Sequence, residues 1–260
     1  MQACVVTTPY RPSPAVAARA ERTAAALGAR YVERRGLSVA KLRERHGAAV
    51  VVVGAASLEW HPAEGGAPFF FHPGMSLVRA KRLAEGRGDV MLEASAFAPG
   101  DSVVDCTAGL CSDSIVFSFA GGPDTRVTAA ESEFPLYFVV SRGLAEYESG
   151  WEPFDRAMRR VGLAYADHLT LLRTLPDKSE DIVYFDPMFR DPVRASTGIS
   201  PLRSLANEAA VTEEAIEEAR RVARKSVVLK ERGHAEEWAR FGFDVVSKPN
   251  APVAYGVIRI

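Results

Sequence analysis

The residues best suited to chemistry end an apolar run, "DIVYFDPMF", near the end of the chain's third quarter. Such a run is typical of a buried strand, yet this one closes on Asp186, Pro187, Met188 and Phe189. The carboxylate can accept hydrogen bonds from an amine, and the proline fixes φ and removes a competing N–H donor. Phe189 offers a ring face for a planar base, and Met188 offers a pliable apolar wall. We interpret these four residues as a catalytic group that holds an amine acceptor.

A second group follows the predicted strand 102–107, in the stretch "DCTAGLCSD". A dinucleotide-binding loop would have the pattern G-x-G-x-x-G here, so that a helix N-terminus approaches a pyrophosphate. This loop instead combines a single glycine, Gly109, with the two carboxylates Asp105 and Asp113. Carboxylates repel phosphate and attract cations. The loop therefore favours S-adenosylmethionine (SAM), which carries an ammonium and a sulfonium, over a dinucleotide.

Two further predicted strands, 126–132 and 162–167, also end in polar residues. Glu131 lies about 20 positions beyond the first loop, where an acidic residue can hold the ribose hydroxyls of an adenosine. Asp167 and His168 are positioned to flank the adenine. The residues that we predict to bind the cofactor are Asp105, Ala108, Gly109, Ser112, Asp113, Glu131, Ser132, Asp167, His168 and Asp186.

Two cations are candidates for binding the substrate. Arg87 lies in the turn "EGRGD", where its planar guanidinium suits the cofactor's carboxylate or an RNA phosphate, although a plain surface arginine is an equal reading. Lys230 closes the predicted strand 226–231, and we expect it to contact a substrate phosphate. The cysteine and histidine spacings match no zinc pattern, so we predict no metal site.

The elements that must position these residues follow a clear alternation from about residue 75 onward. Strand patterns at 102–107, 126–132, 162–167, 181–187 and 226–231 are interleaved with helical patterns such as 112–121, 135–148 and 213–225. This order predicts an α/β fold, a doubly wound and mostly parallel sheet with helices on both faces. The last two strand patterns, 243–248 and 253–260, are close enough to form an antiparallel hairpin at one edge.

The first 74 residues predict a small α/β annex, with strands at 3–8 and 48–54 and helices at 15–29 and 37–47. We therefore place a domain boundary near residue 75, after a turn-rich and aromatic segment.

Composition limits the class of protein. The 260 residues carry 32 Lys and Arg against 33 Asp and Glu, a net charge of -1, whereas a nucleic-acid binder usually has a basic excess. Any RNA contact must then come from a local patch. There is no signal peptide pattern, and no apolar run approaches the roughly 18 residues of a membrane span. These features predict a cytoplasmic protein that does not bind membranes.

The motif "DPMF" resembles the D/N-P-P-Y/F/W group of methyltransferases that act on exocyclic amines. The stretches "GRGD", "VVDCTAGLCSD", "VTAAESE", "DIVYFDPMF" and "SVVLKE" are similar, in the same order, to a bacterial family of small-subunit rRNA guanine-N2 methyltransferases. The similarity runs from about residue 70 to the C-terminus. It implies a Rossmann-like class I methyltransferase fold, SAM as cofactor and rRNA or the small ribosomal subunit as partner. It also implies that Asp186 contacts both cofactor and acceptor.

One departure from that family concerns the segment after the motif. The family tends to have a lysine-rich stretch there, whereas this chain has only Arg190, Arg194 and Arg203. Two alternatives therefore stay open: a methyltransferase for a small-molecule amine, and a non-catalytic RNA-binding or assembly factor that retains the fold. The sequence also leaves the oligomeric state open, with a homodimer among the options.

Overall fold

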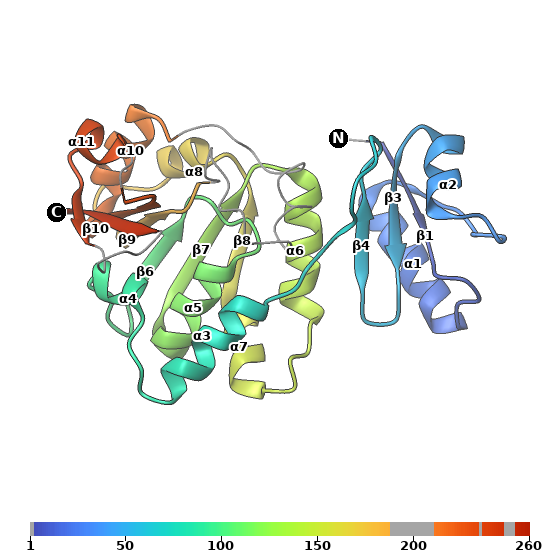
Figure 1. The fold of residues 1–260 in the computed structure, drawn as a ribbon, viewed down its shortest axis with the longest axis horizontal. Helices are drawn as coiled ribbons and strands as arrows, with labels where there is room; N and C mark the ends of the chain where they lie inside the picture. Colours follow the sequence, from blue (N-terminus) through green and yellow to red (C-terminus); the bar gives the residue numbers. More distant parts are fainter. Residues whose placement is uncertain (1–2, 188–210, 234–235, 247–252) are drawn as a thin grey trace. The chain divides into compact units, whose positions relative to one another are not determined.

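The structure, a computed structural model, forms two compact units (Figure 1). It describes residues 3–187, 211–233, 236–246 and 253–260. Among them, residues 3–72 and 134–147 form the first unit, and the remainder form the second. The predicted residues Met188 and Phe189 lie outside the described residues. No helix in the described ranges is long and apolar enough to cross a membrane.

The second unit is built on a seven-stranded sheet with the order β11-β12-β10-β9-β6-β7-β8. Its strands are β6 (Ser102–Asp105), β7 (Arg126–Glu131), β8 (Val161–Tyr165), β9 (Glu180–Phe185), β10 (Ala223–Glu231), β11 (Asp244–Val246) and β12 (Ala254–Arg259). Strand β12 runs antiparallel to both β10 and β11, while the pairs from β10 to β8 are parallel. The predicted doubly wound fold is confirmed, and the antiparallel strand lies one place in from the edge.

Helices cover both faces of this sheet (Figure 1). They are α3 (Gly74–Ala84), α4 (Val90–Ala94), α5 (Ser112–Gly121), α7 (Glu152–Arg160), α8 (His168–Thr174), α10 (Glu213–Val222) and α11 (Glu237–Phe241), with a short 3-10 turn at Gly122–Asp124. Side chains of α4 and α5 pack in the core on one face. Those of α8, α10 and α11 pack in the core on the other face.

The position of strand β9 explains why apolar and polar residues do not alternate along its apolar run. Ile182 and Tyr184 belong to the core under α4 and α5, whereas Val183 and Phe185 belong to the core under α8 and α10. Successive side chains of a strand point to opposite faces, and both faces are covered here, so every position from Ile182 to Phe185 is apolar or aromatic. The next residue, Asp186, is the first to leave the core.

The first unit holds a five-stranded mixed sheet with the order β2-β1-β3-β4-β5. Its strands are β1 (Cys4–Thr7), β2 (Arg30–Tyr31), β3 (Ala49–Val53), β4 (Leu58–His61) and β5 (Phe69–Phe70), and its helices are α1 (Pro14–Leu27), α2 (Val39–His46) and α6 (Phe134–Glu146). Ser13 and Ser38 cap α1 and α2 by accepting from backbone N–H groups three residues on, and left-handed Gly28 and Gly47 end them.

Helix α6 has an unexpected place in the fold. The sequence predicts a helix at 135–148, inside the alternation of the large sheet, but α6 contacts β4 and β5 of the first unit. Gly143 permits this packing, since a Cβ there would lie 2.1 Å from Cγ of Phe71. A close approach between residues so far apart in the chain leaves no local signal in the sequence.

The boundary between α10 and β10 also differs from the sequence prediction. The helical pattern suggests a helix to residue 225, yet α10 ends at Val222 and β10 begins at Ala223. The strand has a register shift between Ala223 and Ser226. Its two intervening basic side chains form ion pairs with carboxylates on neighbouring segments, and these pairs favour the extended conformation.

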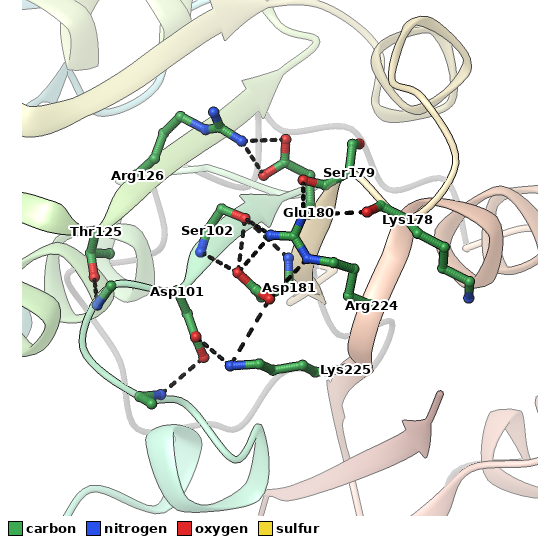
Figure 2. A network of polar contacts seen from close by, with 12 residues as sticks. Asp101, Ser102, Thr125, Arg126, Lys178, Ser179, Glu180, Asp181, Arg224 and Lys225 are labelled. Carbon is green, nitrogen blue, oxygen red and sulfur yellow. Dashed lines mark hydrogen bonds and ion pairs between the residues drawn. The ribbon is translucent and has the colours of Figure 1, made fainter.

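A polar network ties the amino ends of the central strands together (Figure 2). At its centre, Asp181 accepts hydrogen bonds from the backbone N–H of Ser102 at 3.0 Å and from Nε and Nη2 of Arg224 at 3.0 and 2.9 Å. Nearby, Glu180 accepts two hydrogen bonds from Nη2 of Arg126. Hydrogen bonds from Arg224 and Ser102 lower the pKa of Asp181 to about 2 despite partial burial. The network lies opposite the edge that carries the candidate site.

We expect Asp181→Ala to lower the free energy of unfolding by about 1 to 3 kcal/mol, because it leaves a buried N–H and a guanidinium without their acceptor. The native pKa is lower than the unfolded value of about 3.9, so this contribution is present at neutral pH. It should be lost as pH falls from about 4 towards 2. Urea unfolding at pH 7 and pH 3 measures both values. Asp177→Ala removes an exposed ion pair with Arg221 and should cost less; equal losses would contradict the account.

Candidate active site

Four strands of the second unit bring ionisable residues to one edge of the sheet. β6 ends in Asp105, β7 ends in Glu131, β9 is followed by Asp186, and Lys230 is the penultimate residue of β10. These strands are mutually parallel neighbours, so their carboxyl ends lie together. Ligands of open α/β sheets bind at this edge, which makes it the candidate active site.

The loop after β6 connects two of the predicted carboxylates. Asp105 is buried and accepts from the backbone N–H of Thr107 at 3.0 Å and from Oγ of Ser114 at 2.5 Å. Oγ1 of Thr107 in turn accepts the backbone N–H of Asp186 at 2.5 Å. The start of the "DPMF" segment is therefore fixed to the loop that we expect to surround the cofactor.

Glu131 is held by backbone donors on both carboxylate oxygens. Oε2 accepts the N–H of Gly109 at 3.1 Å, and Oε1 accepts the N–H of Glu133 at 2.8 Å. Gly109 has a φ of +48°, which favours glycine at this turn. The side chain of Glu131 is thus oriented before any ligand binds, while it remains only 7% exposed.

The ammonium of Lys230 lies between two carboxylates that come from different elements. Its Nζ is 2.7 Å from Oδ2 of Asp186 and 3.2 Å from Oδ2 of Asp113, near the start of α5. We expected Lys230 to contact a substrate phosphate, and that contact stays a prediction. In the structure, the lysine connects the end of β10 to the end of β9 and to α5.

Asp113 has two further partners. The buried hydroxyl of Tyr184 donates to its Oδ2 at 2.7 Å, and Nη1 of Arg79 donates to its Oδ1. Arg79 also forms a two-pronged pair with Asp89, through Nε at 2.8 Å and Nη2 at 2.9 Å. The network therefore extends from β10 and β9 through α5 to α3 and to the N-cap of α4.

The surroundings of these carboxylates divide them into two kinds. Two cations and a hydroxyl outweigh burial at Asp113 and hold its pKa well below the ordinary value. Burial raises the pKa of Asp105 to about 6 and that of Glu131 to about 7, since no cation contacts either of them among the described residues. Burial and the nearby Asp113 carboxylate also raise the pKa of Asp186 to about 7, against the opposing effect of Lys230.

The predicted adenine-flanking pair begins α8. Oδ1 of Asp167 caps this helix by accepting from the N–H groups of Leu169 at 3.0 Å and Thr170 at 3.2 Å. His168 meets the ring of Phe185 edge-on, with ring centroids 5.9 Å apart. Burial lowers the pKa of His168, so its ring is neutral near pH 7. Asp167 therefore stabilises the start of α8 as its N-cap, independently of any contact with a ligand.

The other predicted residues are distributed around this edge. Ala108 is buried in the loop, Ser112 begins α5, Ser132 follows β7 and Pro187 follows Asp186. Arg87 is exposed in the turn between α3 and α4 and pairs with Glu85 at 2.7 Å. Within the described part of the chain, no group of three or more metal-ligating side chains is placed to hold an ion.

Sequence reasoning missed three residues that hold the network together. Tyr184 gave a faint signal, because it places a hydroxyl inside an otherwise apolar strand. Arg79 gave none, because its partner Asp113 lies 34 residues away and the helix pattern around it is ordinary. Thr107 lies inside the first loop, but only the fold shows that it holds the backbone of Asp186.

Comparison with known proteins agrees with this geometry. Residues 60–241 match the family described as "Putative SAM-dependent methyltransferase". The chain belongs to this family. It is a SAM-dependent methyltransferase, and SAM is its cofactor.

Two relatives and one solved structure are similar to this chain. "Uncharacterized protein YpiP" of Bacillus subtilis is 40% identical over 255 residues, which cover 98% of this chain and 99% of that protein. "Ribosomal RNA small subunit methyltransferase J" of Escherichia coli is 29% identical over 189 residues, 70% of this chain and 72% of that protein. The SAM-dependent methyltransferase NGO1261 from Neisseria gonorrhoeae has the same fold, with a TM-score of 0.62 at 18% identity, covering 98% and 95% of the two chains.

The residues at the edge fit this cofactor. Burial raises the pKa values of Asp105 and Glu131 because protein cations do not balance their charge, and a cationic ligand relieves that cost. Glu131, fixed by Gly109 and Glu133, would accept from the ribose hydroxyls. Asp113 is already neutralised by Lys230 and Arg79.

We expect Glu131→Gln to weaken SAM binding about 10-fold or more, because a charge-assisted acceptor becomes a neutral amide. The ligand-free variant should have a stability that depends less on pH than that of the wild type, although its single amide oxygen can accept only one of the two backbone N–H groups. In the wild type the native pKa exceeds the unfolded value, so stability falls as pH rises from about 4.5 to 7, and the amide lacks this loss. Calorimetry and thermal unfolding measure these quantities. Glu133→Gln is the control, and equal affinity losses in both variants would contradict the assignment.

We expect Lys230→Met to lower Tm by about 5 to 10 °C at pH 8, because it leaves the buried Asp113 and the half-buried Asp186 without their shared cation. The loss should be smaller at pH 5, where protonation relieves the repulsion. Lys230→Arg should recover part of the stability, and Lys81→Met, at an exposed site on α3, should change little. A loss in Lys230→Met that does not depend on pH would contradict this account.

Proposed function

We propose that the protein methylates an exocyclic amine, with guanine N2 of small-subunit rRNA as the acceptor. One observation carries the amine assignment. Asp186 is fixed at the edge of the sheet through its backbone N–H and through Oδ2, which Lys230 occupies. Among the described residues no partner contacts Oδ1, so this oxygen is available to accept from an amine N–H.

The fixed carboxylate suits the reactivity of such an amine. The nitrogen lone pair is delocalised into the base, so the amine is a weak nucleophile that must be held in place. When bound, SAM supplies an electrophilic methyl group on its sulfonium. Asp186 would orient the amine through Oδ1, and Pro187 keeps a competing N–H donor away. We assign Met188 and Phe189 to the wall and the stacking face for the base.

Asp186 also offers a place for the proton that the amine must lose. Its pKa is raised to about 7, so the carboxylate can accept a proton at neutral pH and release it to water. Lys230 is not suited to accept this proton, because contact with Asp113 and Asp186 raises its pKa above the ordinary lysine value. It remains an ammonium and positions Asp186.

The nature of the substrate is supported by similarity. The relative named "Ribosomal RNA small subunit methyltransferase J" covers 70% of this chain, and the motif order resembles that of guanine-N2 enzymes. An rRNA substrate would place the protein in the cytoplasm. We further propose that residues 75–260 form the methyltransferase domain and residues 1–74 an annex to it.

A small-molecule amine is the second candidate, and the net charge of -1 favours it. Salt dependence separates the two. Substrate binding should weaken steeply with salt if the substrate is RNA, and should be nearly indifferent to salt if the substrate is small and neutral.

The proposed function is tested by mass spectrometry of small-subunit rRNA digests from cells with and without the gene. We expect one N2-methylguanosine to be lost on deletion and restored by the wild-type gene. Asp186→Ala should not restore it, with a rate at least about 100-fold below the wild type, because the amine is no longer held.

Asp177→Ala, which removes an exposed carboxylate before the opposite end of β9 from Asp186, is the matched control and should restore the modification. Thermal unfolding checks that Asp186→Ala is folded. Identical modification maps with and without the gene would contradict the rRNA assignment. Restoration of the modification by Asp186→Ala would contradict the assignment of Asp186 to the active site.

A further inference from the structure

We infer that the first unit carries a surface for single-stranded RNA, formed by Tyr10, Arg11, Arg34 and Arg35 on two adjacent loops. This inference rests on the proposed function, because it names the part of the chain that would hold the RNA substrate. It does not depend on how the two units are arranged, since all four residues belong to the first unit.

The basic charge of the chain is concentrated in the first unit. Residues 1–72 contain nine Lys and Arg against five Glu, whereas residues 73–260 contain 23 Lys and Arg against 28 Asp and Glu. The segment 30–46 alone holds six basic residues against two glutamates. The net charge of -1 therefore hides a local basic segment, the electrostatic feature expected of an RNA-binding surface.

The two loops lie at the carboxyl ends of β1 and β2, which are parallel neighbours. Oγ1 of Thr7, the last residue of β1, donates to the carbonyl of Val32, just after β2, at 2.7 Å. Farther out, the hydroxyl of Tyr10 donates to the carbonyl of Leu37 at 3.2 Å. The loop after β1 is thus fixed against the loop after β2.

An arginine and an aromatic ring stack at the junction of these loops. Cζ of Arg34 lies 4.0 Å from the ring centroid of Tyr10, and its Nε donates to the carbonyl of Leu37 at 2.9 Å. Although the pair is ordered, Tyr10 remains 54% exposed. An exposed aromatic ring with a fixed guanidinium plane is the kind of platform on which unpaired bases stack.

Two further arginines flank this platform, one on each loop. Arg11 and Arg35 are both exposed, and both have left-handed backbone conformations, with φ of 56° and 41°. Side-chain-bearing residues rarely adopt this conformation; Ala96, Cys111 and Lys178 also do so here, and residues of this kind cluster at functional sites. Arg35 pairs with Glu33 at 3.0 Å, but both side chains are largely exposed, so phosphate can replace the glutamate.

The combination favours RNA over a protein partner. A protein interface would call for an apolar centre. Here the platform has one aromatic ring, three guanidinium groups and a net positive segment beside it, which suits unpaired bases and phosphates.

The test measures fluorescence anisotropy of a labelled, mixed-sequence 12-nucleotide single-stranded RNA with the full chain at several salt concentrations. Tyr10→Ala and Arg34→Ala should each weaken binding by about 5-fold or more, because each removes half of the platform. Tyr10→Phe keeps the ring and should stay within about 2-fold of the wild type. Arg35→Ala should reduce the salt slope by about 0.7, the value for one phosphate contact on a single strand.

Arg22→Ala removes the same charge from an exposed position on α1 of the same unit and serves as the matched control. SAM binding by calorimetry should be unchanged in every variant. Arg34→Lys keeps the charge without the planar stack. An RNA affinity between those of the wild type and Arg34→Ala would show that the loss of binding in Arg34→Ala is not a loss of folding.

The inference is overturned if the wild type does not bind the RNA, or if Tyr10→Ala and Arg34→Ala bind it as the wild type does. It is also overturned if these variants lose binding only to intact small subunits, which would indicate a protein partner. Methyl transfer by the wild type is measured separately. Its absence would contradict the proposed function, while RNA binding by this surface would still be decided by anisotropy.

Discussion

The candidate site depends on one half-buried cation shared by two carboxylates. The ammonium of Lys230 contacts Asp186 beyond β9 and Asp113 on α5, and Asp113 is held from its other side by Arg79. Four elements that are distant in sequence are fixed relative to one another by these contacts. One oxygen of the Asp186 carboxylate is held by Lys230, and we propose that the other orients the weakly nucleophilic amine.

The same network separates carboxylates with a structural duty from those suited to a ligand. Asp113 is neutralised by two cations, and its pKa is lowered accordingly. Asp105 and Glu131 are buried without such neutralisation, and their pKa values are raised to about 6 and 7. Uncompensated negative charge costs stability in the free protein and favours a cationic ligand. This distinction cannot be read from the sequence, in which all three are acidic residues in or just after the segments that end the strands.

Local patterns in the sequence were sufficient to predict the fold of the second unit. The apolar run of β9, the alternation of strands and helices, and the closely spaced last two strands correspond to the sheet that is observed. The placement of α6 on the first unit was not predictable, because it depends on the approach of Phe71 to Gly143. Helix α7 was also missed, although Pro153 at its first turn and apolar residues at Phe154, Ala157 and Met158 are typical helix signals.

For the site, sequence reasoning identified residues that end strands, because parallel strands bring their carboxyl ends to one edge. It did not identify the partners of those residues. Arg79 and Tyr184 reach Asp113 across 34 and 71 positions of the chain, and such long-range pairs follow from the fold and not from a motif. The roles of Met188 and Phe189 stay predictions from the motif alone.

The central claim is that Lys230 is a permanent cation that holds Asp186. Its most direct test is an NMR pH titration of the Lys230 side-chain nitrogen and the Asp186 carboxyl carbon in the ligand-free protein. The account predicts that Lys230 remains protonated beyond the ordinary lysine pKa of about 10.4, while Asp186 titrates near pH 7. A Lys230 signal that titrates at or below the ordinary value would contradict it.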